Sequence, residues 1–188
     1  MSSSDRPLGA KGLQLLLTWA AALALSALLV WCGRHWSLPL LEQPLPPLRD
    51  PELDTAGFEA LELDCPMPLV ADESCWNLAD LVRLAPYVDG INIKLLKSGG
   101  LAEAWLMAQA ARRLGLGVMV GCYSDAALLN GAAAQLMPLV TWPDLDSHLN
   151  LVDDPFAGLN LVADRLLPPP GPGLGIALDT NVEGDRAC

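Results

Sequence analysis

Asp89-Gly-Ile-Asn-Ile-Lys94-Leu-Leu-Lys97-Ser-Gly-Gly100 is the stretch around which the rest of the chain can be arranged. The apolar residues from Ile91 to Leu96 predict a buried strand, and the glycine pair after them predicts a bend. Lys94 then stands where burial and neighbouring charges can lower the pKa of an ammonium, which would make it a proton acceptor near neutral pH. The alternative is a solvated lysine that protects a sheet edge from aggregation.

The composition narrows the class of protein. A chain of 188 residues has room for one sizeable domain, or for a small one with an appendage. A formal net charge of −11 argues against a nucleic-acid partner, because the chain could not neutralise phosphates. The five cysteines show no C-x-x-C spacing and there are only two histidines, which argues against structural zinc. Free thiols in a reducing compartment, the cytoplasm, are the simplest interpretation.

An apolar run of twenty residues, Leu13 to Cys32, predicts a helix within an N-terminal segment 1–35. It is long enough to span a bilayer, and Arg34 follows it as a flanking charge would, so a single-pass membrane protein is the alternative to a cytoplasmic one. Against the membrane, small and polar residues recur every four positions, as a packed soluble helix could use them. These residues are Gln14, Thr18, Ala22 and Ser26.

Strand and helix signals alternate from residue 36 onward, which predicts an α/β domain over 36–188 with a parallel sheet. Short apolar runs predict strands at Leu38–Leu41, Pro68–Ala71, Ile91–Leu96, Gly117–Gly121 and Leu139–Trp142. Helices are predicted from Asp50-Pro51 onward and over Asn77–Ala85, Leu101–Leu114 and Ala126–Met137.

Residues typical of functional sites follow the predicted strands at regular intervals. Successive spacings of 30, 22, 27 and 23 residues separate Glu42, Asp72, Lys94, Gly121 and Asp144, and each is one strand plus one helix. Parallel α/β folds of the barrel type build their sites at the carboxyl ends of the strands. These residues are therefore predicted to meet at one face.

Four motifs in this order resemble the later barrel strands of the enolase superfamily, muconate-lactonizing subgroup, and within it the dipeptide epimerases of the L-Ala-D/L-Glu epimerase type. The motifs are Leu41-Glu42-Gln43-Pro44-Leu45, Val70-Ala71-Asp72-Glu73-Ser74, Ile91-Asn92-Ile93-Lys94-Leu95 and Asp144-Leu145-Asp146. The resemblance covers about residues 36–178. It implies the C-terminal part of a (β/α) TIM-type barrel, preceded here by the apolar helix over 13–32.

The resemblance also implies roles for five residues. Glu42 and Asp72 would be metal ligands for Mg²⁺, a hard cation that prefers oxygen. Lys94 would be the catalytic lysine on one face of the substrate's α-carbon, where it removes or returns a proton. Asp144 and Asp146 would bind the α-ammonium of a dipeptide substrate. From the residues alone, each role has an alternative. Asp144 and Asp146 could belong to a solvated loop, Glu42 could be a turn residue, and Asp72 could be a helix-capping acid.

Two acids stay without an assigned role. Asp89 has none. Asp125 lies where related sequences often have Glu after the seventh strand, which offers a role in the substrate pocket.

The chain also departs from the family pattern. The N-terminal capping domain, the Lys-x-Lys motif and the first metal-binding Asp are absent, and no acidic residue lies between Asp5 and Glu42. Three hypotheses follow: the C-terminal half of a dipeptide epimerase that needs its missing half, an inactive truncated or frameshifted remnant, and a membrane-anchored binding module. Because a partial barrel exposes apolar edges, we also expect self-association.

Overall fold

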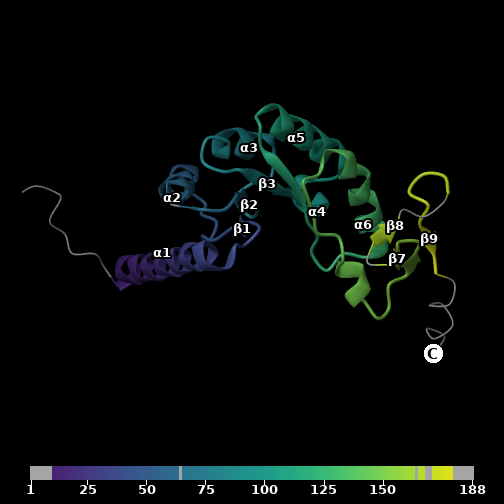
Figure 1. Ribbon diagram of the computed structural model, residues 1–188, viewed down its shortest axis with the longest axis horizontal. Coiled ribbons are helices and arrows are strands. Elements are labelled where there is room, and N and C mark those ends of the chain that lie inside the picture. The colour runs from purple at the N-terminus through teal and green to yellow at the C-terminus, as the bar shows by residue number, and fades with distance from the viewer. Residues whose placement is uncertain (1–9, 64, 164, 168–170, 180–188) are drawn as a thin grey trace, which may run out of the picture.

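The structure, a computed structural model, describes residues 10–63, 65–163, 165–167 and 171–179. Its centre is a curled parallel sheet whose five strands follow one another in chain order (Figure 1). This agrees with the predicted α/β fold, a partial (β/α) barrel preceded by an apolar helix. The strands are β1 (Leu41–Glu42), β2 (Leu69–Ala71), β3 (Gly90–Ile93), β4 (Gly117–Val120) and β5 (Trp142–Pro143).

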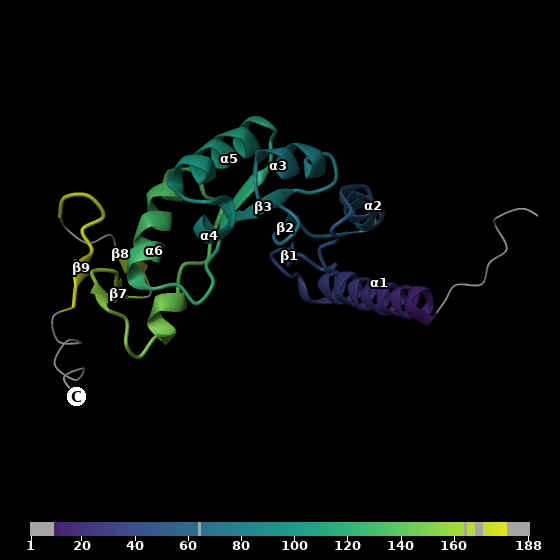
Figure 2. The ribbon, with the colours of Figure 1, turned by 180° about the vertical axis from the view of Figure 1, so that it is seen from behind.

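The helices between these strands begin where capping residues predict them. Asp50 caps α2 (Pro51–Glu62) by accepting hydrogen bonds from the backbone N–H groups of the first turn, and Asn77 does the same for α3 (Leu78–Leu84). α5 (Leu101–Arg113) lies beside α3 on the outer side of the sheet in both views (Figures 1 and 2). The local capping signals were sufficient to place the starts of α2 and α3.

Four predicted elements differ from the structure. Two are strands that lie further along the chain than predicted: β1 is Leu41–Glu42 and not Leu38–Leu41, and β5 is Trp142–Pro143 and not Leu139–Trp142. The strand predicted to run to Leu96 ends at Ile93, and a one-turn helix α4 (Leu95–Ser98) follows Lys94. Gly99 ends that helix with φ +82°, a left-handed conformation that glycine adopts without strain. The last predicted helix is divided into α6 (Ala127–Ala133) and a 3₁₀ helix, η1 (Ala134–Leu139), which contains Pro138.

The strands alternate between an apolar outer face and an inner face of different chemistry. On β3, Ile91 and Ile93 are fully buried in the hydrophobic core that includes residues of α3 and α5. On the inner face the Trp142 ring lies against Gly117, where an added Cβ would come within 2.3 Å of it. One layer further along the strands, the Asn92 side chain occupies the space beside Gly121. The inner face therefore changes from apolar to polar toward the carboxyl ends of the strands.

The predicted apolar helix is present as α1 (Ala10–Trp36), which extends away from the sheet on the β1 side (Figure 1). Its C-terminal part packs on the domain: Val30 is buried in the core, and the Ser26 hydroxyl donates to the Pro44 carbonyl at 2.8 Å. The side chains of Gln14, Thr18 and Ala22 lie outside the described part of the chain. Among the described residues, no helix combines the length and apolar character needed to cross a membrane. The boundary between residues 35 and 36 stays a prediction.

The chain after β5 forms short antiparallel pairs that the sequence did not predict. η2 (Ser147–Asn150) comes first, then β6 (Phe156–Ala157) pairs with β9 (Ala177–Leu178), and β7 (Asn160–Val162) pairs with β8 (Arg165–Leu167). Within the described residues, β1 and β5 each have one neighbouring strand in the central sheet. Self-association through these edges stays a prediction.

Candidate active site

The carboxyl ends of the parallel strands bring the predicted site residues to one edge of the sheet. Glu42 ends β1, Asp72 follows β2 and Lys94 follows β3. Glu42 is in register with Val70, and Ala71 with Ile91, so the three side chains come from neighbouring strands at similar heights. Because side chains alternate along a strand, they share the inner face of the sheet with Asn92.

Glu42 and Asp72 form a pair of neighbouring carboxylates. Burial raises the pKa of Glu42 and the charge of Asp72 raises it further, although a hydrogen bond of 2.6 Å from Asn92 Nδ2 opposes both effects. Asp72 is only 2% exposed. Burial raises its pKa, but the charges and hydrogen bonds of Lys97 and Lys94 outweigh that effect and hold the pKa below its ordinary value.

Lys94 Nζ lies 2.5 Å from Asp72 Oδ2, and the Tyr123 ring covers the ammonium at 4.7 Å from the ring centroid. The sequence predicted that the surroundings would lower the pKa of this lysine, and that direction is wrong for the structure. Burial does lower it, but the hydrogen bond and the charge of Asp72, with Glu42 and Glu73, raise it by more. Lys94 is therefore held as an ammonium while Asp72 faces it.

Lys97 is a second lysine of the site, and the sequence assigned it no role. Its side chain is 0% exposed, and its ammonium donates to Asp72 Oδ1 at 2.5 Å. It also donates to the backbone carbonyls of Asp72 and Asn92, at 2.6 and 2.8 Å. Burial lowers its pKa, and the charge of Asp72 opposes that effect. The signal by which the sequence could have identified Lys97 was its position, three residues after Lys94 and in the turn that follows it.

Two further polar residues support the carboxylates. Asn92, fully buried between two isoleucines of β3, donates to Glu42. Gln43 follows Glu42 with φ +36°, and its side-chain oxygen accepts from the backbone N–H of Asp72 at 2.9 Å. A polar residue inside an apolar strand, as at Asn92, is the signal by which sequence reasoning could have found the first of them.

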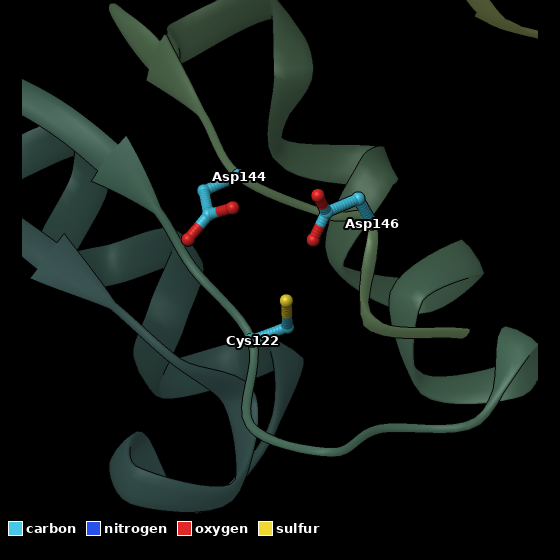
Figure 3. Close-up of side chains that lie close together, drawn as sticks. All are labelled: Cys122, Asp144 and Asp146. Atoms are coloured by element: carbon cyan, nitrogen blue, oxygen red, sulfur yellow. The ribbon is translucent and has the colours of Figure 1, made fainter. Parts of the chain in front are cut away.

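Asp144 and Asp146 lie at the end of β5, with Cys122 from the end of β4 between them (Figure 3). One ligand atom from each of the three residues lies within 4.8 Å of the others. Both aspartates are exposed. Partial burial and the charge of Asp146 raise the pKa of Asp144. Two exposed anions side by side can attract one small cation, such as an ammonium group.

The remaining two acids have structural contacts. Asp125 is buried, and its Oδ2 accepts from the backbone N–H of Tyr123 at 3.2 Å, which fixes the loop that places the Tyr123 ring. Asp89 Oδ2 accepts from the backbone N–H of Leu69 at 2.8 Å and so holds the start of β2. The role of Asp125 in a substrate pocket stays a prediction.

The donor atoms of Glu42 and Asp72 fit part of a magnesium site. Both residues offer carboxylate oxygens, which are the ligands that Mg²⁺ prefers. A cation between them would relieve the repulsion that raises the pKa of Glu42. Each Asp72 oxygen accepts from one lysine, and a carboxylate has about four acceptor positions, so lone pairs remain for a metal ion.

Comparison with known proteins identifies the family. A sequence profile described as enolase C-terminal domain-like matches residues 17–182. The chain belongs to the enolase superfamily. This enolase-superfamily chain is 41% identical over 138 residues to a hydrophobic dipeptide epimerase of a Flavobacteria bacterium, an alignment that covers 73% of the chain and 38% of the relative.

Solved structures of the superfamily give the same result. The substrate-liganded L-Ala-D/L-Glu epimerase from Bacillus subtilis has a TM-score of 0.72 at 28% identity, over 80% of this chain and 43% of that one. A dipeptide epimerase from Enterococcus faecalis, complexed with Mg and the dipeptide L-Leu-L-Tyr, has a TM-score of 0.71 at 31% identity, over 81% and 44%. The chain therefore spans about two fifths of the length of these relatives.

Proposed function

We propose that this chain supplies one catalytic edge of a dipeptide epimerase, which removes and returns the α-proton of a dipeptide with the assistance of Mg²⁺. The observation that carries the proposal is the ion pair between Asp72 and Lys94, at 2.5 Å, beside Glu42 and on the same sheet face as Asp144. The similarity to dipeptide epimerases supports the reaction, and the bound Mg and dipeptide of the E. faecalis structure support the metal and the substrate class.

Each residue has a separate task in this proposal. Mg²⁺ held by Glu42 and Asp72 would supply positive charge that favours loss of the proton next to the substrate carboxylate. Lys94 exchanges that proton: its ammonium donates it, and its neutral amine accepts it. Asp144 and Asp146 bind the α-ammonium of the dipeptide through charge-assisted hydrogen bonds.

The order of the strands gives the substrate a direction. The Lys94 end of β3 and the Asp144 end of β5 are separated by β4. A dipeptide that lies across the end of β4 can therefore place its ammonium at the aspartates and its carboxyl-terminal α-carbon at the lysine. Tyr123 and Cys122, which follow β4, would lie beneath the peptide bond.

The proposal separates two reactions. Exchange of an α-proton with solvent needs one base, and Lys94 is sufficient for it. Epimerisation by two bases needs a second lysine on the opposite face of the α-carbon, and a third carboxylate would complete the metal site. We expect a complementary polypeptide to supply both.

The test is complementation. This chain is mixed with the N-terminal part of the Flavobacteria relative, Mg²⁺, and either L-Ala-L-Glu or a hydrophobic dipeptide, and the products are separated by chiral chromatography. We expect epimerisation that requires both polypeptides and Mg²⁺ and that is lost in Lys94→Met. Co-elution in size-exclusion chromatography checks that the two polypeptides assemble. If they do not, a fusion of the two polypeptides replaces the mixture in the assay. An assembled complex without turnover would refute the proposal and favour the inactive remnant.

A further inference from the structure

Lys94 and Lys97 share one carboxylate, but they are bonded differently. Lys97 Nζ lies 2.5 Å from Asp72 Oδ1, and Lys94 Nζ lies 2.5 Å from Asp72 Oδ2. The Lys97 side chain is 0% exposed, whereas that of Lys94 is 10% exposed. Two lysines with the same partner therefore differ in their access to a substrate.

A count of donors makes the difference sharper. A lysine ammonium has three N–H donors and no acceptor. Lys97 directs its three donors to three protein oxygens, namely Asp72 Oδ1, the Asp72 carbonyl and the Asn92 carbonyl. Lys94 donates to one protein oxygen among the described residues, Asp72 Oδ2, and its ammonium faces the Tyr123 ring. All three N–H donors of Lys97 are therefore used by these oxygens, whereas two N–H donors of Lys94 have no protein oxygen as acceptor among the described residues.

The backbone explains why Lys97 reaches this position. Since β3 ends at Ile93 and α4 begins at Leu95, the first turn of α4 returns the Lys97 side chain toward the ends of β2 and β3. Lys97 donates to both the backbone carbonyl and the side chain of Asp72. These two contacts to one residue restrict the rotation of the Asp72 side chain.

The same strand also fixes the other carboxylate. Asn92 donates to Glu42 through its side chain and accepts from Lys97 through its carbonyl. A continuous path of hydrogen bonds thus runs from Glu42 through Asn92 and Lys97 to Asp72. Outer-shell partners of this kind orient metal ligands in proteins.

We propose that Lys97 is a positioning residue that fixes the orientation of the Asp72 carboxylate, so that Lys94 is left as the lysine whose donors reach the substrate. The consequence for catalysis rests on the proposed function. The fixed orientation of Asp72 does not, and it can be measured without metal, substrate or turnover.

The direct test is the side-chain rotamer of Asp72, measured by NMR from its three-bond N–Cγ coupling. We expect a single rotamer in the wild type and in Lys94→Met, which is the matched control because it removes the partner of the other oxygen. Lys97→Met is expected to give a coupling averaged over several rotamers. A single rotamer in folded Lys97→Met, or equal averaging in both variants, would overturn the proposal.

A second variant separates hydrogen bonding from charge. Lys97→Gln restores two donors without the positive charge. If Lys97 acts by positioning, Lys97→Gln should recover most of the coupling expected of a single rotamer. The glutamine variant also replaces Lys97→Met in the test if Lys97→Met does not fold. A role as counter-ion alone predicts that the glutamine variant is as averaged as Lys97→Met, and this result would also overturn the proposal.

Metal binding gives the functional consequence. In Mn²⁺ titrations followed by electron paramagnetic resonance, we expect Lys97→Met to weaken binding about tenfold, the lower end of the usual effect of outer-shell partners. Lys94→Met should weaken it less than twofold. The titrations use the assembled complex with the complementary polypeptide. A fixed Asp72 rotamer in the wild-type chain, together with an assembled complex that binds no Mn²⁺, would support the positioning claim and count against the proposed function. Equal losses in the two variants would contradict the positioning claim.

Discussion

The candidate site has two halves of opposite character. The buried half consists of Glu42, Asp72, Lys94 and Lys97 on the side of β1 to β3, where the side chains of Asp72 and both lysines are at most 10% exposed and are hydrogen-bonded. The open half consists of Cys122, Asp144 and Asp146 at the ends of β4 and β5, where both aspartates are exposed. Groups that exchange protons need fixed geometry and perturbed pKa values, whereas groups that capture a flexible ammonium need access. Under the proposed function, the buried half would carry out the proton transfer and the open half would bind the substrate.

Thiol reactivity should show the largest difference between the halves. Cys75, in the core beside the buried half, is 0% exposed, and burial raises its pKa to about 12 from an ordinary 9.0. Because the thiolate is the nucleophile, a pKa raised by three units slows alkylation about a thousandfold. We expect iodoacetamide to label Cys122 and leave Cys75 unmodified in peptide maps of the folded protein. Both should label in urea, and equal labelling of the folded protein would contradict the burial described.

Asp72→Asn should cause the largest loss of stability. It leaves two lysine ammonium groups in a buried site without their carboxylate, and the loss of one partner of a buried ion pair costs about 3–5 kcal/mol. The same change in the open half, Asp146→Asn, should alter the free energy of unfolding by less than about 0.5 kcal/mol. Urea unfolding of both variants measures the difference. Similar values would show that the halves do not differ energetically.

Gly121→Ala should have an intermediate effect. Its added Cβ would lie 2.6 Å from Asn92 Nδ2, so the amide that donates to Glu42 must move. Overpacking of this kind costs about 1–3 kcal/mol. Gly171→Ala is the control, because its Cβ meets its nearest neighbour at an ordinary 3.4 Å. The prediction fails if the two variants unfold at the same urea concentration.

Asp144→Asn should have the smallest effect, and its sign depends on pH. Burial and Asp146 raise the pKa of Asp144 in the folded state above its ordinary 3.8. The stability from this group is therefore present below pH 3.8 and is lost as the pH rises through the folded pKa. The variant avoids that loss, so at neutral pH it should be more stable than the wild type by less than about 0.5 kcal/mol. Unfolding curves from pH 3 to 7 check this, and a destabilised variant at neutral pH would contradict it.

The features that sequence predicted well depend on local signals. Asp50 and Asn77 cap helices through bonds to residues two and three positions away, so their effect is visible in a short window. The order Glu42, Asp72, Lys94 and Asp144 follows from strand periodicity, which also operates over short distances. The resemblance to the enolase superfamily supplied the roles.

The features that sequence missed depend on contacts between distant segments. An apolar run such as Ile91 to Leu96 does not by itself distinguish a strand from a strand followed by a helix. The role of Lys97 therefore depended on where β3 ended. The pKa of Lys94 was predicted in the wrong direction because it is set by Asp72, 22 residues away in sequence and in direct contact in space.

The central claim is that Lys94, beside the carboxylates of the buried half, exchanges the α-proton of a dipeptide. It is tested most directly by deuterium incorporation into L-Ala-L-Glu in D₂O, followed by NMR, with the assembled complex of this chain and the complementary polypeptide. The account predicts Mg²⁺-dependent exchange at the α-carbon of the glutamate residue, and at least a hundredfold loss in Lys94→Met, the contribution expected of a general base. Exchange that is equal in wild type and Lys94→Met, or no exchange in an assembled complex, would contradict it.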